Sequence, residues 1–276
     1  MSIAYYANKA TEAFWSDYWQ QTQLNHLLKV AARDPLTQHF KRHLPKSGLI
    51  LEGGCGLGQY VLFFQQQGYQ IIGGDFSLPA LQAHQKVSGN SPLVGLDLCH
   101  MACPDNTFQA HISIGVIEHF EEGPAQILAE MYRTLAPGGV LLLTVPWVNG
   151  YRRLAKPFIE REQQKLRQTQ AEFYQYAYTR QELQTFLETA GFQVDTFYPY
   201  SPAKGLREIR TTRKFEKMLG NRKAKGPSPS PGTSIKITIP PEEAIQGIRK
   251  LLYWDPILRM FAHMILGVAH KPKSGS

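Results

Sequence analysis

The sequence predicts an α/β fold in which helices cover both faces of a mainly parallel sheet. Three observations support this prediction. Between residues 49 and 147, apolar runs typical of strands alternate with stretches typical of helices. A glycine-rich turn joins the first of these strands to the first helix. Within 137–147, four consecutive apolar residues indicate a strand that is buried on both faces.

The predicted strands and helices mostly alternate up to residue 147, and longer segments separate the later ones. The predicted strands are 49–53, 69–77, 91–98, 108–117, 137–147, 192–200 and 263–271. The predicted helices are 58–68, 78–87, 124–135 and a later one that ends near Gly191. Gly68 is a natural stop for the first helix, and Thr179 with Glu182 has the spacing of a capping box that opens the last one. The 276 residues suffice for one large domain with an insertion.

The composition is typical of a soluble, cytoplasmic protein. A hydrophobic fraction of 43% with 19% charged residues excludes a wholly disordered chain. The opening residues MSIAYYANKATEAFW have no basic stretch followed by an apolar one, so we expect no secretory signal. The longest apolar runs are far shorter than the ~20 residues that a membrane span needs. Three cysteines cannot form a disulfide framework, which favours a reducing compartment.

The stretch LEGGCGLG, residues 51–58, indicates a site for a nucleotide-like ligand where a strand ends and a helix begins. A dinucleotide-binding loop requires G-x-G-x-x-G, but the third glycine position holds Gln59 or Val61, depending on the starting glycine. No Gly-Lys-Ser/Thr follows, so the stretch is not a P-loop. What remains is an acid, Glu52, followed by G-x-G-x-G.

This pattern resembles the glycine loop of the class I S-adenosylmethionine (SAM) dependent methyltransferases, in particular the type-11-like, small-molecule branch. The companion motifs of that family follow in order: GGDFS at 73–77, GLDL at 95–98, ISIGVIEHF at 112–120 and LAPGGVLLLTVP at 135–146. The resemblance covers roughly residues 45–200 and 262–271. It implies a Rossmann-like, doubly wound, seven-stranded sheet whose last strand is antiparallel. It also implies SAM as cofactor and S-adenosyl-L-homocysteine as product.

The resemblance implies a set of cofactor-binding residues: Glu52, Gly53, Gly54, Cys55, Gly56, Gly58, Asp75, Phe76, Ser77, Asp97, Leu98 and Ile114. Glu52 would attract the methionyl ammonium, directly or through water. Asp75 would accept both ribose hydroxyls, and Asp97 would meet the adenine amino group. Each has a structural alternative. The glycines can merely permit positive φ, Asp75 can cap the next helix, and Asp97 can be an ordinary loop acid.

His119 is the candidate catalytic residue. Methyl transfer from a sulfonium is an in-line displacement, which needs a general base only if the acceptor keeps a proton. The family motif places His119 at the reactive end of the cofactor, so it is the candidate base for transfer to oxygen. The alternative is a histidine that only shapes the pocket or caps the following helix.

Aromatic residues from two segments are candidates for contact with the acceptor. Trp15 and Trp19 share helical spacing with Phe14 and Tyr18, and the resemblance implies a helical lid over residues 1–45. A helix docked on the core would have the same pattern. Tyr176 and Tyr178 alternate at strand spacing and could line an acceptor pocket, although a half-buried strand does the same.

Nearly all the excess charge lies in one segment. Residues 204–225 hold nine Lys or Arg and two Glu, a net +7 of the chain's +8. This segment belongs to a predicted helical insertion, 201–261, between the last two strands. A basic amphipathic helix favours an anionic membrane surface or a lipid-linked acceptor. RNA is the competing partner, but neither the [D/N]-P-P-[Y/F] motif nor a Pro-Cys nucleophile occurs at the expected place.

The sequence therefore predicts one methyltransferase domain over residues 46–276 behind an N-terminal lid. The predicted reaction is methyl transfer from SAM to an oxygen of a small-molecule or lipid-linked acceptor. An RNA methyltransferase and a non-catalytic SAM-binding protein are the alternatives. Cys99, His100 and Cys103 lack a convincing fourth ligand, so no metal site is predicted.

Overall fold

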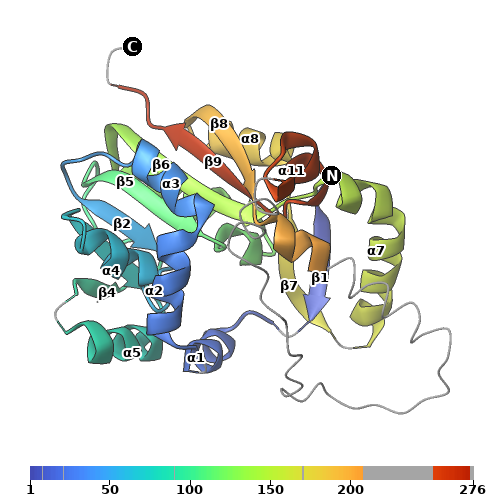
Figure 1. The fold of residues 1–276 in the computed structure, drawn as a ribbon, viewed down its shortest axis with the longest axis horizontal. Helices are drawn as coiled ribbons and strands as arrows, with labels where there is room; N and C mark the ends of the chain where they lie inside the picture. The colour runs from blue at the N-terminus through green and yellow to red at the C-terminus, as the bar shows by residue number, and fades with distance from the viewer. Residues whose placement is uncertain (8, 21, 90, 170, 208–250, 274–276) are drawn as a thin grey trace.

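A seven-stranded sheet forms the centre of the protein (Figure 1). The computed structural model describes residues 1–276 except 8, 21, 90, 170, 208–250 and 274–276. The strands lie in the order β4 (Leu93–Gly95), β3 (Ile71–Asp75), β2 (Ile50–Gly53), β5 (Phe108–Ile114), β6 (Leu135–Pro146), β9 (Met264–His270) and β8 (Gln193–Tyr200). β9 runs antiparallel to both of its neighbours, β6 and β8, and the other pairs are parallel, which confirms the predicted sheet.

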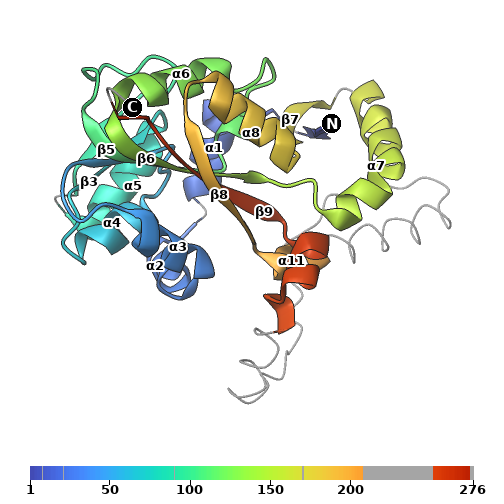
Figure 2. The ribbon, with the colours of Figure 1, turned by 90° about the horizontal axis from the view of Figure 1, so that it is seen from above.

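Helices cover both faces of this sheet (Figure 2). One face carries α6 (Ala125–Thr134) and α8 (Arg180–Thr189), whose buried side chains join one core cluster. The other carries α2 (Leu24–Arg33), α3 (Pro35–His43), α4 (Gln59–Gln65) and α5 (Leu78–Ser88), which pack in a second cluster. Each helix buries one stripe of its surface, as amphipathic spacing requires. The predicted capping box of Thr179 and Glu182 opens α8.

The N-terminal region contains a strand as well as helices. β1 (Ile3–Ala7) pairs antiparallel with β7 (Glu172–Ala177), and α1 (Glu12–Gln20) follows. The sequence predicted only helices over residues 1–45, because the partner of β1 lies some 170 positions away and no local pattern reveals it. Between β6 and β7, α7 (Gly150–Gln168) continues through Pro157, which costs the helix one backbone hydrogen bond.

The segment between β8 and β9 is described only at its two ends. Residues 201–207 and 251–263 are described and include α11 (Asp255–Phe261), while most of the basic segment 204–225 lies outside the described residues. Among the described helices, none has the length and apolar character needed to span a bilayer.

Candidate active site

A cavity of about 610 Å³ opens beyond the carboxyl ends of the parallel strands. It lies where the chain switches from the β2–β3–β4 side of the sheet to the β5–β6 side, the place at which open α/β sheets bind ligands. Its lining residues come from α1 and the residues just before it, from the last residues of β3 and β5, and from the loops that follow β2, β3, β4 and β5: Ala10, Trp15, Tyr18, Trp19, Gly54, Asp75, Phe76, Leu96, Asp97, Leu98, Ile114, Gly115, Val116, His119 and Phe120.

The glycine loop needs glycine for two separate reasons. Gly54 and Gly56 both have positive φ, +73° and +53°, which L side chains rarely adopt. In addition, a Cβ on Gly54 would collide with Val116, and one on Gly56 would collide with the indole of Trp19. The loop is held to β3 by hydrogen bonds from the amides of Gly54 and Cys55 to the carbonyl of Gly74, 2.8 and 3.1 Å long.

Glu52 lies beneath the loop and does not line the cavity. It is 2% exposed, and its carboxyl accepts a hydrogen bond of 3.0 Å from the amide of Val61 in the first turn of α4. Because the N-cap of α4 is Gly58, which has no side chain, Glu52 satisfies an amide that would otherwise lack a partner. Burial raises the pKa of Glu52 to about 8. Glu52 therefore supports the start of α4 and does not lie at the cavity wall, where a direct contact with the methionyl ammonium would require it.

Glu52→Gln is expected to change the pH dependence of stability. A carboxyl whose pKa is raised on folding contributes stability below its unfolded pKa and loses it as the pH rises through the folded value. Relative to Glu52→Gln, the wild type should therefore lose about 1.4 kcal/mol per pH unit between 4.5 and about 8. Urea unfolding at acid, neutral and alkaline pH measures this. Glu122→Gln, at an exposed site, is the control, and parallel curves for wild type and Glu52→Gln would refute the assignment.

Asp75 ends β3 at the wall of the cavity and organises the loops around it. One carboxylate oxygen accepts from the amide of Gly56 at 2.7 Å, and the other accepts from the amide of Ser77 at 2.8 Å. A carboxylate can accept about four hydrogen bonds, so part of this capacity remains for a ligand. Asp75 is 5% exposed, and burial raises its pKa. Phe76, next to it, lines the cavity and is nearly half exposed.

Asp97 and Leu98 line the cavity after β4, beside Leu96. One carboxylate oxygen of Asp97 accepts from the amide of Cys99 at 2.8 Å, and the other lies 3.2 Å from Nδ1 of His100. Leu98 packs against the backbone of Gly53, where an added Cβ would lie 2.8 Å from it. The cavity therefore has an acid at the end of each of two adjacent strands, β3 and β4.

His119 reaches the cavity from the turn η1 (Ile117–His119) that follows β5. Its Nδ1 lies 2.7 Å from the carbonyl oxygen of Tyr174. A carbonyl can only accept, so Nδ1 donates, and in the neutral ring Nε2 keeps its lone pair. Burial lowers the pKa of His119, which favours this neutral form. The ring of Trp15 packs on it edge-on, with centroids 5.1 Å apart.

Helix α1 closes the cavity from one side. Trp15 and Trp19 stack with centroids 6.3 Å apart, and Trp19 rests on the glycine loop. A hydrogen bond of 3.0 Å between the hydroxyls of Ser16 and Ser77 ties α1 to the loop after β3. Six further lining residues carry no motif of their own and are marked in the sequence only by their closeness to motif residues: Ala10, Tyr18, Leu96, Gly115, Val116 and Phe120.

The remaining predicted site residues do not line the cavity. Tyr178 is 3% exposed in the core beside Phe186, and the Tyr176 hydroxyl donates to the carbonyl of Glu121. Cys55 is buried within the glycine loop, and Gly58 caps α4. Among the described residues, no group of three or more His, Cys, Asp or Glu is arranged to hold a metal ion.

Known proteins match the part of the chain that builds this cavity. Residues 51–143 match the family model described as "Methyltransferase domain". A "probable S-adenosylmethionine-dependent methyltransferase" of Mycolicibacterium smegmatis is 30% identical over 58% of this chain and 58% of its own length. The tRNA (carboxymethyluridine(34)-5-O)-methyltransferase of Schizosaccharomyces pombe is 30% identical over 46% of this chain and 54% of its own. The chain thus spans about half the length of these curated relatives.

A solved structure extends the comparison to nearly the whole chain. Phosphoethanolamine N-methyltransferase 2 of Haemonchus contortus, in complex with S-adenosyl-L-methionine, superposes with a TM-score of 0.56 at 20% identity. The match covers 94% of this chain and 60% of that one. This likeness confirms the fold predicted from the sequence motifs.

Proposed function

We propose that the chain is a class I SAM-dependent methyltransferase that transfers a methyl group from SAM to an oxygen of a small-molecule or lipid-linked acceptor. The observation that carries the proposal is that Asp75, Asp97 and His119 all line one cavity. Two of them are acids that follow adjacent strands, and the third is a histidine with a ring nitrogen available as a base.

The cavity suits a SAM-sized ligand. Its volume of about 610 Å³ lies within the usual range for small-molecule sites. Gly54 lets the backbone come close to the ligand, and the spare lone pairs of Asp75 suit two ribose hydroxyls. Asp97 and Leu98 would receive the adenine ring, one through its amino group and the other by packing. The bound cofactor would supply an electrophilic methyl group on a sulfonium.

The residues around His119 suit a proton-bearing acceptor. Nδ1 donates to the carbonyl of Tyr174, so Nε2 would take the hydroxyl proton of the acceptor. The acceptor oxygen would displace the sulfur of SAM from the methyl carbon, and S-adenosyl-L-homocysteine would leave. Trp15 and Phe120 make the surroundings apolar and would exclude water from the displacement. The name of the Schizosaccharomyces pombe relative also records transfer to oxygen, which supports the same atom type here.

Calorimetric titration with SAM and, separately, with NADH tests the cofactor. We expect micromolar binding of SAM and none of NADH, because the loop lacks the dinucleotide spacing. Folded protein, stripped of copurified ligand, that fails to bind SAM would remove the proposal. Acceptors are then screened by S-adenosyl-L-homocysteine release, beginning with hydroxylated and lipid-linked compounds. A protein that binds SAM but releases no product with any acceptor would favour the non-catalytic alternative.

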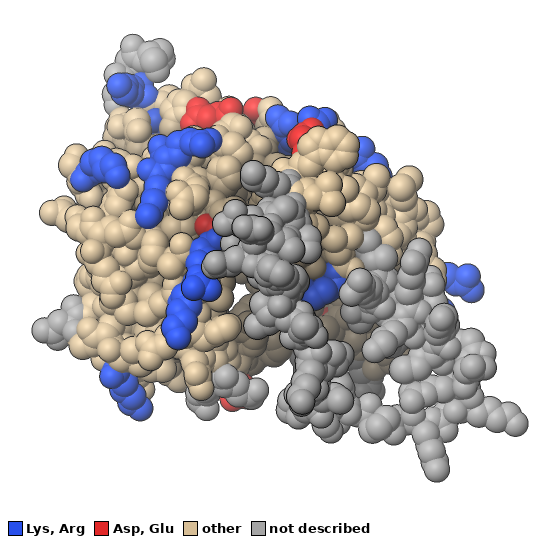
Figure 3. All heavy atoms as spheres, viewed as in Figure 1, with Lys and Arg blue, Asp and Glu red and all other residues tan. Residues whose placement is uncertain are grey.

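RNA is the second candidate acceptor, favoured by the tRNA methyltransferase among the relatives. On the face seen in Figure 3, the Lys and Arg side chains of the described residues are scattered, and they form no single continuous patch there. RNA binding through phosphates predicts a steep fall in affinity with added salt. Equal affinity at low and high salt would count against RNA, whereas cosedimentation with anionic but not neutral vesicles would favour a lipid-linked acceptor.

We further propose that α1 acts as a lid, and Trp19→Ala tests this. Removing the indole that rests on Gly56 should weaken SAM binding about tenfold, mainly through faster dissociation, because water then reaches the bound ligand. Stopped-flow tryptophan fluorescence measures both rate constants. Trp254→Ala removes an exposed indole outside the cavity and is the matched control. Tighter binding by Trp19→Ala would show instead that α1 competes with the cofactor.

A further inference from the structure

One face of α6 contacts the loop that follows Asp97. Gln126, Glu130 and Arg133 lie four and three residues apart, so they share this face of the helix. The side-chain nitrogen Nε2 of Gln126 lies 2.9 Å from Nε2 of His100. Glu130 and Arg133 contact residues further along the same loop. We call residues 97–107 the adenine-side loop, because it begins with the acid assigned above to the adenine amino group.

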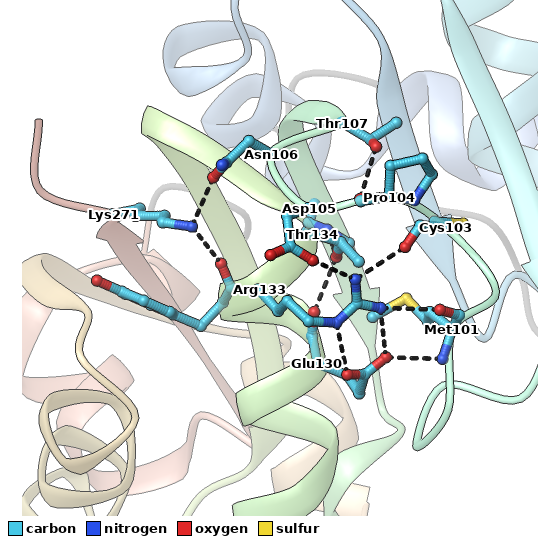
Figure 4. A network of polar contacts seen from close by, with 12 residues as sticks. Met101, Cys103, Pro104, Asp105, Asn106, Thr107, Glu130, Arg133, Thr134 and Lys271 are labelled. Carbon is cyan, nitrogen blue, oxygen red and sulfur yellow. Dashed lines mark hydrogen bonds and ion pairs between the residues drawn. The ribbon is translucent and has the colours of Figure 1, made fainter. Parts of the chain in front are cut away.

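Arg133 uses its whole guanidinium on this loop and on Glu130 (Figure 4). Nη1 donates to the carbonyl of Cys103 at 2.8 Å and to the carboxylate of Asp105 at 2.7 Å. Nη2 donates to the carbonyl of Met101 and to Glu130, both at 2.8 Å, and Nε donates to Glu130 at 2.8 Å. Glu130 in turn accepts from the amide of Met101 at 2.8 Å. Three of these five charge-assisted bonds reach the loop, at Met101, Cys103 and Asp105, and the other two orient Glu130 on α6.

The fixed part of the loop lies close to the cavity. Met101 is 3% exposed, belongs to the core and is held on both its amide and its carbonyl. Only three residues separate it from Asp97, so the position of Met101 limits where Asp97 and Leu98 can lie. The contact between His100 and Asp97 cannot do this alone, because both side chains are well exposed, at 73% and 63%, and exposed pairs are weak.

The far end of the loop has a separate support. Nζ of Lys271, just after β9, donates to the side chain of Asn106 and to the carbonyl of Tyr132, both at 2.8 Å (Figure 4). This contact lies nine residues from Asp97. The chain therefore offers two anchors of the same loop, one near the cavity and one remote from it.

We propose that Arg133 is a positioning residue that sets the recognition of the adenine amino group by holding the adenine-side loop against α6. The proposal rests on the proposed function, because it assumes that SAM occupies this cavity with its adenine at Asp97. Arg133 itself does not line the cavity, so its effect on the ligand would pass through Met101 and the backbone that leads to Asp97.

The test combines protein variants with a ligand change. S-Adenosyl-L-homocysteine and its analogue without the 6-amino group are titrated calorimetrically into wild type, Arg133→Ala, Arg133→Lys and Lys271→Met. We expect wild type to prefer the amino-bearing ligand and Arg133→Ala to lose about tenfold affinity for it, with little change for the analogue, so that the preference disappears. Arg133→Lys, which keeps the charge but not the fork, should retain part of the preference. Lys271→Met should lower the melting temperature and leave the preference intact.

The outcomes are distinct. Equal losses of affinity for both ligands in Arg133→Ala would make Arg133 a merely structural residue and overturn the proposal. So would an unchanged preference, or a loss of preference in Lys271→Met. If Arg133→Ala does not fold, Arg133→Lys decides the question by the same comparison. Wild-type protein that binds neither ligand would overturn the proposed function, and wild-type protein that binds both equally would overturn only the role given to Asp97 and Arg133.

Discussion

Asp75→Ala is expected to raise the dissociation constant for SAM by about 100-fold or more, which corresponds to about 2.7 kcal/mol. The substitution removes the acceptors proposed for the ribose hydroxyls. It also strips the amides of Gly56 and Ser77 of their partner, which costs about 1–3 kcal/mol for each buried group and disorders the loop on which the ligand rests. Calorimetry with SAM measures the loss.

Asp75→Asn is the matched variant, since it keeps one carbonyl oxygen as an acceptor. It should retain part of the affinity and most of the melting temperature. Burial raises the pKa of Asp75, so on acidification this carboxylate is protonated at a higher pH than an exposed aspartate. The affinity of the wild type for SAM should fall from that higher pH downward. Folded Asp75→Ala protein that binds SAM within about threefold of wild type would refute the role assigned to this carboxylate.

His119→Asn is expected to lower kcat by about 10²- to 10⁴-fold while SAM affinity changes little, provided that the acceptor bears a proton. The asparagine amide can still donate to the carbonyl of Tyr174, as Nδ1 does now, but it offers nothing at the position of Nε2. The variant therefore separates the proposed base from the packing role of the ring. Single-turnover rates measured with saturating SAM make the comparison.

The pH profile of the wild type provides a second measure. Burial lowers the pKa of His119 from 6.5, so the neutral, proton-accepting form persists to lower pH than in a free histidine. The rate constant should be level at neutral pH and fall only as the pH drops below 6.5, through that lowered pKa. His119→Asn should lose this acid limb. A variant with wild-type kcat would indicate an acceptor that is already deprotonated, such as a carboxylate.

Local sequence patterns predicted most strands of the sheet and the acids that follow them. The predicted apolar run, acid and glycine loop lie where β2 ends, and Asp75 and Asp97 lie where β3 and β4 end. These patterns involve neighbouring residues, so they can be read without knowing the fold. The capping box of Thr179 and Glu182 is equally local and is present at the start of α8.

Some of the predicted site residues do not line the cavity, because burial and side-chain direction depend on the tertiary structure. Glu52 faces the interior and α4, and Tyr178 packs in the core, although their sequence contexts resemble those of ligand-binding residues. Strand spacing places Tyr176 and Tyr178 on one face but does not say which face meets a cavity. The strand β1 was invisible for a related reason, since its partner β7 is distant in the sequence.

The sequence by itself therefore determined the fold class, with its last strand antiparallel, and singled out Asp75, Asp97 and His119 as candidate site residues. Only the tertiary structure decided that His119 donates to the carbonyl of Tyr174, that Trp19 packs on the glycine loop and that Arg133 hydrogen-bonds to the adenine-side loop. The physical reason is that these contacts join residues between about 30 and 55 positions apart, and such distances close only when the chain packs its helices against the sheet.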